Sequence, residues 1–183
     1  QRVAAGEQVW EPLSVQPLGS WLLGQWELAV NMDLLPLIMP LGSNQVLELW
    51  RQVICEQEGK SSEYHLLRPG AAAEIASDAR DTLIRWQVDM NDQNLRQSFK
   101  LDQDCSTFLH WLALFDQRLN AGGHCTPVDC LVQLLSIAGR LPAARVALIE
   151  FDEIAPLEHS VLKSLGANVS RVSPASHRAK RVT

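Results

Sequence analysis

The chain has 183 residues, of which 46% are apolar and 20% are charged, and its formal charge is −5 at pH 7. This size and composition fit one ordinary domain, or a domain with an insertion, and exclude a disordered tail, a collagen-like fibre and a disulfide-rich miniprotein. No uninterrupted apolar window is long enough for a membrane-spanning helix, so we expect no membrane partner and a cytoplasmic location.

The first half of the chain predicts one short strand followed by helices. Alternating apolar residues between prolines predict a strand at 12–16, and Ser20 is expected to cap the next helix. The polar stretch 91–103 is expected to be a short helix or a loop. Apolar residues at helical spacing predict further helices at 43–58, at 69 to about 88, and at 105–120 with Asp104 as its cap.

The second half of the chain changes in character. Thr126 and Pro127 are typical of the start of a helix, which we expect to end at Gly139. The nearly continuous apolar run at 145–151 is typical of a strand buried on both faces of a parallel sheet. A helix at 156–165 and a strand at 168–172 would complete a βαβ unit. We therefore predict an α/β fold that is mostly helical, with a small parallel sheet interrupted by an inserted helical subdomain.

The charge is divided unevenly along the chain. Residues 1–158 contain all 21 acidic residues and 11 basic ones, which gives them a charge of −10, whereas residues 159–183 contain five basic residues and no acidic one. An acidic body argues against broad coating of nucleic acid. A solvated tail is the simplest interpretation of the basic end. If the chain contacts phosphate, we expect the contacts at Arg171, Arg178, Lys180 and Arg181.

Three carboxylates, Glu150, Asp152 and Glu153, follow the expected buried strand. Ligands of open α/β sheets bind beyond the carboxyl ends of the strands, where carboxylates can hold Mg²⁺ or polarise water. Acidic residues in this place also stabilise the start of the following helix, and we favour that simpler role. A small magnesium-dependent hydrolase that uses these three residues is one alternative function.

Other motifs give no site. Gly59-Lys60-Ser61 is similar to the end of a phosphate-binding loop, but Ile54 stands where the earlier glycine is required. His124, Cys125 and Cys130 form only half of a zinc pattern, so we expect free thiols and no metal or cofactor. The six tryptophans fall mostly on apolar helix faces, which predicts core positions rather than platforms for stacking bases.

Four short patterns occur in a recognisable order along the chain. They consist of Trp10, Pro12, Pro17, Leu18, Trp21 and Leu22; Leu47, Leu49, Trp50, Val53 and Ile54; Phe108, Trp111, Phe115 and Leu119; and residues 145–165. With these patterns the chain resembles the inactivated UvrD-like helicase region of AddB/RecC-type DNA-repair proteins. These include the "probable DNA repair protein" family, whose members end in a PD-(D/E)xK nuclease domain.

This resemblance implies the organisation of the chain. It implies a RecA-like, P-loop-NTPase-like α/β subdomain formed by residues 1–31 and 143–183, and a helical insertion at 32–142. Because the chain begins at Gln1 without a Met and ends in a basic stretch, we expect it to be a fragment of a longer protein. The phosphate-binding loop of such a protein would precede the fragment, and the nuclease motif would follow it.

The departures from the family imply a silent site. Glu150 stands where the family usually has Gly. If Glu150 takes the place of the catalytic Glu of an active helicase, Ile149 takes the place of the metal-binding Asp and cannot ligate a metal. We therefore expect no catalytic residue and no ATPase, helicase or nuclease activity in this segment, although the full-length protein would be an exonuclease or a helicase-like subunit.

The resemblance thus predicts a catalytically silent scaffold of a DNA-repair and recombination nuclease. Its partners would be DNA, contacted through the full-length protein, and a helicase or nuclease subunit. A protein–protein interaction module, whose helical insertion presents an apolar face to a partner, is the other alternative.

Overall fold

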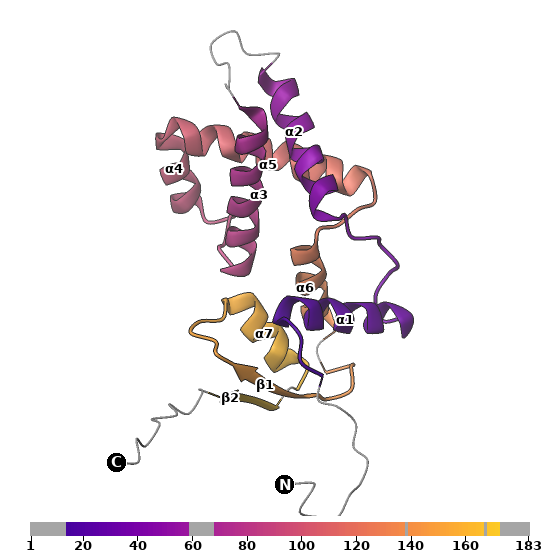
Figure 1. Cartoon of the computed structure of the whole chain (residues 1–183). Coiled ribbons are helices and arrows are strands. Elements are labelled where there is room, and N and C mark those ends of the chain that lie inside the picture. The colour runs from indigo at the N-terminus through magenta and orange to yellow at the C-terminus, as the bar shows by residue number, and fades with distance from the viewer. Residues whose placement is uncertain (1–13, 59–67, 138, 167, 173–183) are drawn as a thin grey trace, which may run out of the picture.

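A computed structural model describes residues 14–58, 68–137, 139–166 and 168–172, and these form a mostly helical molecule with a small parallel sheet. Figure 1 shows the sheet at one end of the molecule, beside the helix that connects its strands, and the helices from the middle of the chain toward the other end. Among the described residues, none of the helices has the length and apolarity needed to cross a membrane. The elements are α1 (Leu18–Asn31), α2 (Ser43–Glu58), α3 (Pro69–Arg85), α4 (Gln93–Leu101), α5 (Gln103–Ala121), α6 (Pro127–Ser136), β1 (Arg145–Ile149), α7 (Pro156–Ser164) and β2 (Asn168–Val172).

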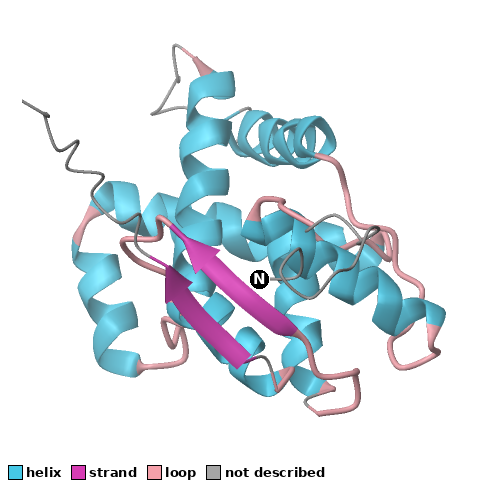
Figure 2. Ribbon diagram, turned by 60° about the horizontal axis from the view of Figure 1, so that its bottom comes forward, coloured by secondary structure: helices cyan, strands magenta, loops and turns pink. Residues whose placement is uncertain are grey.

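The sheet consists of β1 and β2, which pair in parallel and are connected through α7. Leu148 is buried on one face, whereas Ile149 is 53% exposed on the other. Figure 2 shows the two strands in front of the helices, with no described element on their outer side. The predicted βαβ unit is confirmed. The prediction of a strand buried on both faces is wrong, because the described helices cover only one face of the sheet.

The strand expected at 12–16 does not occur in its described part. Residues 14–17 contain no strand, and residues 12 and 13 lie outside the described residues. Val15 is 81% exposed, so this segment neither pairs with nor packs against another described segment. The helix begins at Leu18 rather than after Ser20, and the carbonyl of Pro17 accepts a hydrogen bond from the Trp21 N–H at 3.1 Å. A RecA-like sheet of three strands is therefore not present in the described residues.

One hydrophobic cluster brings the two ends of the described chain together. Trp26 of α1 donates a hydrogen bond from its indole nitrogen Nε1 to Oε1 of Gln133 on α6, at 2.9 Å. The helix α7 covers the inner face of the sheet with apolar side chains. Buried members of this cluster are Leu22, Trp26 and Ala29 of α1, Val128, Leu131 and Leu134 of α6, Leu148 of β1, and Leu157, Val161 and Leu162 of α7.

A second hydrophobic cluster holds α2, α3 and α5 together. Trp50 is fully buried, and its ring stacks on Phe115 with centroids 4.1 Å apart. Ala73 and Ala76 are buried on α3, where their small side chains allow the close approach of α2. The core position predicted for the tryptophans is confirmed for Trp50, as it is for Trp26, but Trp86 at the end of α3 is 48% exposed. Trp10 lies outside the described residues.

Arg80 of α3 lies where the two clusters meet. Its side chain is buried, and its Nε and Nη2 atoms each donate to a carboxylate at 2.9 Å, that of Asp116 on α5 and that of Asp129 on α6. Its Nη1 atom donates to Thr126 Oγ1 at 3.1 Å. Arg80 thus connects three helices that are distant in sequence.

Candidate functional site

The three carboxylates predicted after β1 all lie in the turn that leads to α7. Glu150, Asp152 and Glu153 are exposed there. In the part of the chain that the structure describes, no three His, Cys, Asp or Glu side chains come together in a group that could hold a metal ion. The structure therefore places these residues near one another without assembling a metal site, and nothing in their geometry favours the hydrolase alternative.

The backbone of Glu150 explains why this position suits glycine. Its φ angle is +60°, in the left-handed region that residues with a Cβ atom adopt at a cost of roughly 1–2 kcal/mol. The chain needs this conformation to leave β1 and turn toward α7. The requirement at position 150 is consequently a matter of backbone conformation and does not depend on the carboxylate.

Glu158 is a carboxylate near this turn that sequence reasoning missed. It lies in the first turn of α7, is buried, and pairs with Arg85 of α3. Its Oε2 atom has no hydrogen-bond partner among the described residues. An acid in the first turn of a helix is the only signal that the sequence offers for it. Its contact with Arg85 connects α7 to the helical end of the molecule, which is a structural role.

The cluster around Arg80 is also structural in its electrostatics. Burial acts to lower the pKa of Arg80, but Asp129 and Asp116 more than offset this effect and raise it. Burial raises the pKa of Asp116, and the nearby guanidinium of Arg80 only partly compensates. Thr126 donates to Asp129 Oδ2 from its N–H and its hydroxyl, both at 2.8 Å. The charged groups of this cluster pair with one another, and the cluster thereby joins α3, α5 and α6.

The cysteines form no disulfide bond with one another. All four are free thiols. The Sγ atoms of Cys125 and Cys130 lie 3.7 Å apart, and burial raises the pKa of both thiols. A thiol with a raised pKa is a poor nucleophile and a poor metal ligand. His124 is exposed and does not join them in a metal-holding group within the described chain.

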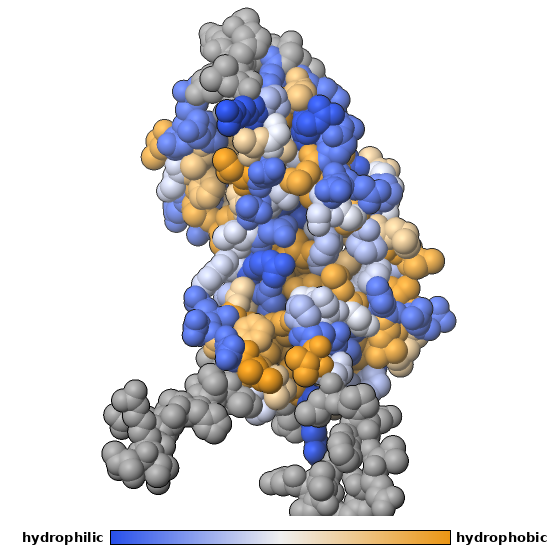
Figure 3. Space-filling model, in the orientation of Figure 1, coloured by the Kyte–Doolittle hydropathy of each residue, from blue (hydrophilic) through white to orange (hydrophobic). Residues whose placement is uncertain are grey.

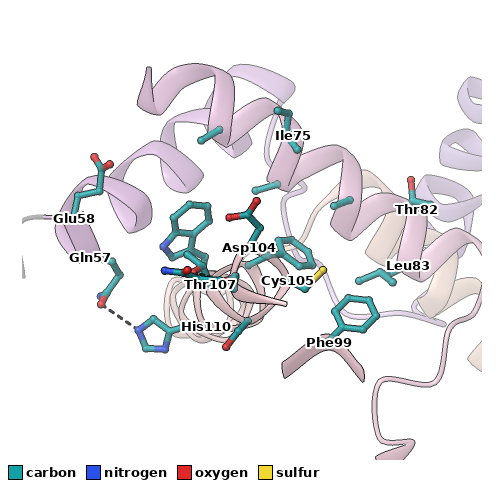
Figure 4. A pocket seen from close by; sticks show the side chains of 17 residues that line it. Gln57, Glu58, Ile75, Thr82, Leu83, Phe99, Asp104, Cys105, Thr107 and His110 are labelled. Atoms are coloured by element: carbon teal, nitrogen blue, oxygen red, sulfur yellow. Dashed lines mark hydrogen bonds between the residues drawn. The ribbon is translucent and has the colours of Figure 1, made fainter. Parts of the chain in front are cut away.

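A cavity of about 1030 Å³ lies between α3, α4 and α5, beside the end of α2. Figure 4 shows Gln57, Glu58 and His110 toward one end of it and Thr82, Leu83 and Phe99 toward the other. His110 Nε2 and Gln57 Oε1 are 3.1 Å apart, so these two polar groups bind each other. The sequence did not identify this cavity, because its walls come from four helices.

The chemistry of this cavity is that of binding rather than catalysis. Most of its lining is apolar, and Ile75 on its α3 wall is 71% exposed. The thiol of Cys105 lines it, but burial raises the pKa of this thiol. Among the described residues the thiol belongs to no group that could hold a metal ion, and the ring of His110 pairs with Gln57. An apolar surface without an activated nucleophile can hold a ligand or a partner.

The expected phosphate contacts lie at the edge of what the structure describes. Arg178, Lys180 and Arg181 lie outside the described residues. Arg171 is part of β2, whose backbone register pairs it with Leu148, and its side chain is not described. Comparisons with protein-family models, with curated proteins and with solved structures found no match. The helicase resemblance therefore stays a prediction.

Proposed function

We propose that this chain is a catalytically silent, helicase-like scaffold of a DNA-repair nuclease, built on a RecA-like subdomain with a helical insertion. The observation that best supports the proposal is the interrupted layout. The helix α1 and the β1–α7–β2 unit come from opposite ends of the described chain and share one hydrophobic cluster. The helices α2, α3 and α5 lie between them in sequence and have a cluster of their own.

The uncovered face of the sheet also supports this proposal. Parallel sheets are normally buried on both faces, yet Ile149 of β1 is 53% exposed on the uncovered face. In a RecA-like domain, further strands and another layer of helices would cover this face. Apolar side chains also reach the surface on the side of the sheet end that Figure 3 shows.

The turn after β1 supports a scaffold without catalytic activity. Ile149 occupies the position that would have to supply a metal-binding carboxylate. Glu150 takes the left-handed conformation, and Asp152 and Glu153 are exposed. The contribution of the segment to repair would then be to hold other domains and to contact the DNA backbone.

Binding of labelled single-stranded and double-stranded DNA, followed by fluorescence anisotropy, tests this proposal. If four phosphates are contacted, affinity should fall about 100-fold between about 50 and 200 mM salt. Replacing Arg171, Arg178, Lys180 and Arg181 by Gln should abolish this binding. The matched control replaces four exposed basic residues elsewhere in the chain by Gln and should leave the affinity for DNA unchanged. These residues are Arg51, Arg68, Arg96 and Lys100. No DNA affinity, or an equal loss in the control, would contradict the proposal.

A further inference from the structure

The cavity between α3, α4 and α5 has no role in the proposed scaffold, and we call it the α3–α5 groove. Its volume of about 1030 Å³ lies at the upper end of the range of about 300–1,000 Å³ that is typical of small-molecule pockets. Its α3 wall includes Ala72 and Ala79, two small residues that are partly exposed. Such small side chains let the backbone of another helix come close. The shape therefore suits a row of side chains better than one compact ligand.

The helix α4 forms one wall of the groove and is only partly packed. None of its residues is buried, and its main contacts are with α5. Phe99 lines the groove, and Leu101 at the end of α4 is 90% exposed. Little of the surface of α4 is buried in the chain itself. A partner inserted in the groove would therefore bury apolar surface of α4, which favours binding.

The charges of the groove favour a basic partner. Among the described residues, its lining includes the carboxylate of Asp104 and no Lys or Arg. Asp78 is exposed on α3, three residues after Ile75 and four before Thr82, and so lies beside both on the helix surface. The bases of α4, Arg96 and Lys100, do not line the groove. Complementary charge steers a partner and sets its register.

We propose that the α3–α5 groove binds an amphipathic helix of another protein, with an apolar face that enters the groove and with Lys or Arg beside that face. In this mode of recognition, apolar side chains at positions i, i+3 or i+4, and i+7 of the bound helix contact the groove. The proposal goes beyond the scaffold function and does not depend on it. A small polar ligand is disfavoured, because Gln57 and His110 already bind each other.

The probe is a labelled synthetic peptide of about 16 residues, or four helical turns, with Leu at the anchor positions and Lys beside them. Two control peptides are used, one with the same composition in an order that removes the apolar face, and one with Glu in place of Lys. Fluorescence anisotropy with the full chain should show saturable binding of the Lys peptide. Both control peptides should bind at least about tenfold more weakly.

The free thiols give a readout that is specific to the groove. Cys105 lines the groove, whereas Cys55 is exposed on α2 and does not. Saturation with the Lys peptide should slow the alkylation of Cys105, followed by mass spectrometry, and should leave that of Cys55 unchanged. Equal rates for Cys105 with and without the peptide would place the peptide elsewhere and overturn the proposal.

A pair of variants separates the groove from other apolar surface. Ile75→Lys places a like charge on the exposed α3 wall and should weaken binding of the Lys peptide at least about tenfold. Leu37→Lys alters an equally exposed apolar residue outside the groove and should bind as the parent chain does. Circular dichroism checks that both variants are folded. Unchanged binding by Ile75→Lys would overturn the proposal, because the groove would then not be the binding site. Self-association of the parent chain that Ile75→Lys abolishes would also overturn it, because the occupant would then be a second copy of this chain.

Discussion

Arg80 is a single residue on which the packing of three helices depends. Replacing it by Met removes the guanidinium that pairs with Asp116 and Asp129, and leaves Asp129, whose side chain is 22% exposed, without that partner. We expect Arg80→Met to lower the free energy of unfolding by about 3 kcal/mol, since breaking a buried ion pair on one side leaves an uncompensated charge. Urea denaturation measures the change.

The matched control for Arg80 is Arg51. Arg51 pairs with Glu48 on the exposed surface of α2. Exposed ion pairs contribute little, so Arg51→Met should change the free energy of unfolding much less than Arg80→Met does. Equal effects of Arg80→Met and Arg51→Met would show that burial of the Arg80 cluster does not stabilise the fold.

Asp81 gives a prediction for the dependence of stability on pH. Burial raises the pKa of Asp81, and the nearby Arg85 and Arg80 only partly oppose this. A carboxyl with a raised pKa in the folded state adds stability when it is protonated, and this contribution is lost as the pH rises through its folded pKa. Asp81→Asn should therefore stabilise the protein at pH 7, and the gain should shrink as the pH is lowered. A gain that grows toward acid in urea denaturation would contradict this.

Side chains such as Arg80 mark the limit of what the sequence reveals at this scale. Burial of Trp26 and Trp50 follows from their place on apolar helix faces. The partners of Arg80 are 36, 46 and 49 positions away along the chain, and no periodic pattern connects them. Such contacts depend on how the helices pack, which local spacing does not determine.

At the scale of elements, the turn between β1 and α7 offers a test through Glu150. Glu150→Gly removes the cost of a Cβ atom in the left-handed region, roughly 1–2 kcal/mol. The glycine also gives the unfolded chain more conformational entropy, which lowers the free energy of unfolding by about 0.5–1 kcal/mol. We expect a net rise of about 0.5 kcal/mol in the free energy of unfolding, measured with urea. The control is Glu153→Gly, which lies in the same turn without a positive φ and should lower stability instead. A loss in both variants would mean that the Glu150 side chain itself stabilises the turn.

The helices were predictable because their apolar faces repeat at a regular spacing, but their caps were less so. The helix α5 was expected to begin after Asp104, whereas Asp102 caps it by accepting a hydrogen bond from the Cys105 N–H at 2.8 Å. Two aspartates separated by one residue satisfy the same local rule. Asp102 also ends α4, and a residue shared by two helices is not visible in either pattern alone.

Strands were less predictable than helices, because a strand requires a neighbour. The segments that form β1 and β2 were identified from their apolar runs, and their parallel pairing followed from the helix between them. Alternation at residues 12–16 looks similar, but Val15 packs against no element of the described part of the chain. Local alternation carries no information about whether a partner strand is present.

At the scale of the whole molecule, the described residues divide into two hydrophobic clusters that α3 joins. The helix α6 falls within the stretch that the sequence assigns to the helical insertion, yet its apolar side chains pack with α1 and α7. Contacts that join the clusters include the Arg80 network, the pair formed by Arg85 and Glu158, and Ile84 of α3, which packs against the first cluster. The large groove lies on the side of the second cluster, away from the sheet.

This arrangement predicts that the two clusters unfold together only as long as α3 connects them. In the double variant Arg80→Met, Arg85→Met, the two clusters should open separately. The opening that exposes the amides of α2 and α5 to hydrogen exchange should have a lower free energy than the opening that exposes those of α6 and α7. Native-state hydrogen exchange with mass spectrometry measures this difference.

The control for this experiment removes two ion pairs that do not join the clusters. Arg51 pairs within α2, and Arg118 pairs with Glu56 between α5 and α2, so both contacts lie inside the helical end of the molecule. The double variant Arg51→Met, Arg118→Met should keep the exchange pattern of the parent chain, because the network between the clusters is intact. If the Arg80 and Arg85 variant also keeps one common opening, apolar contact between the clusters is sufficient to couple them, and the role assigned to α3 is wrong.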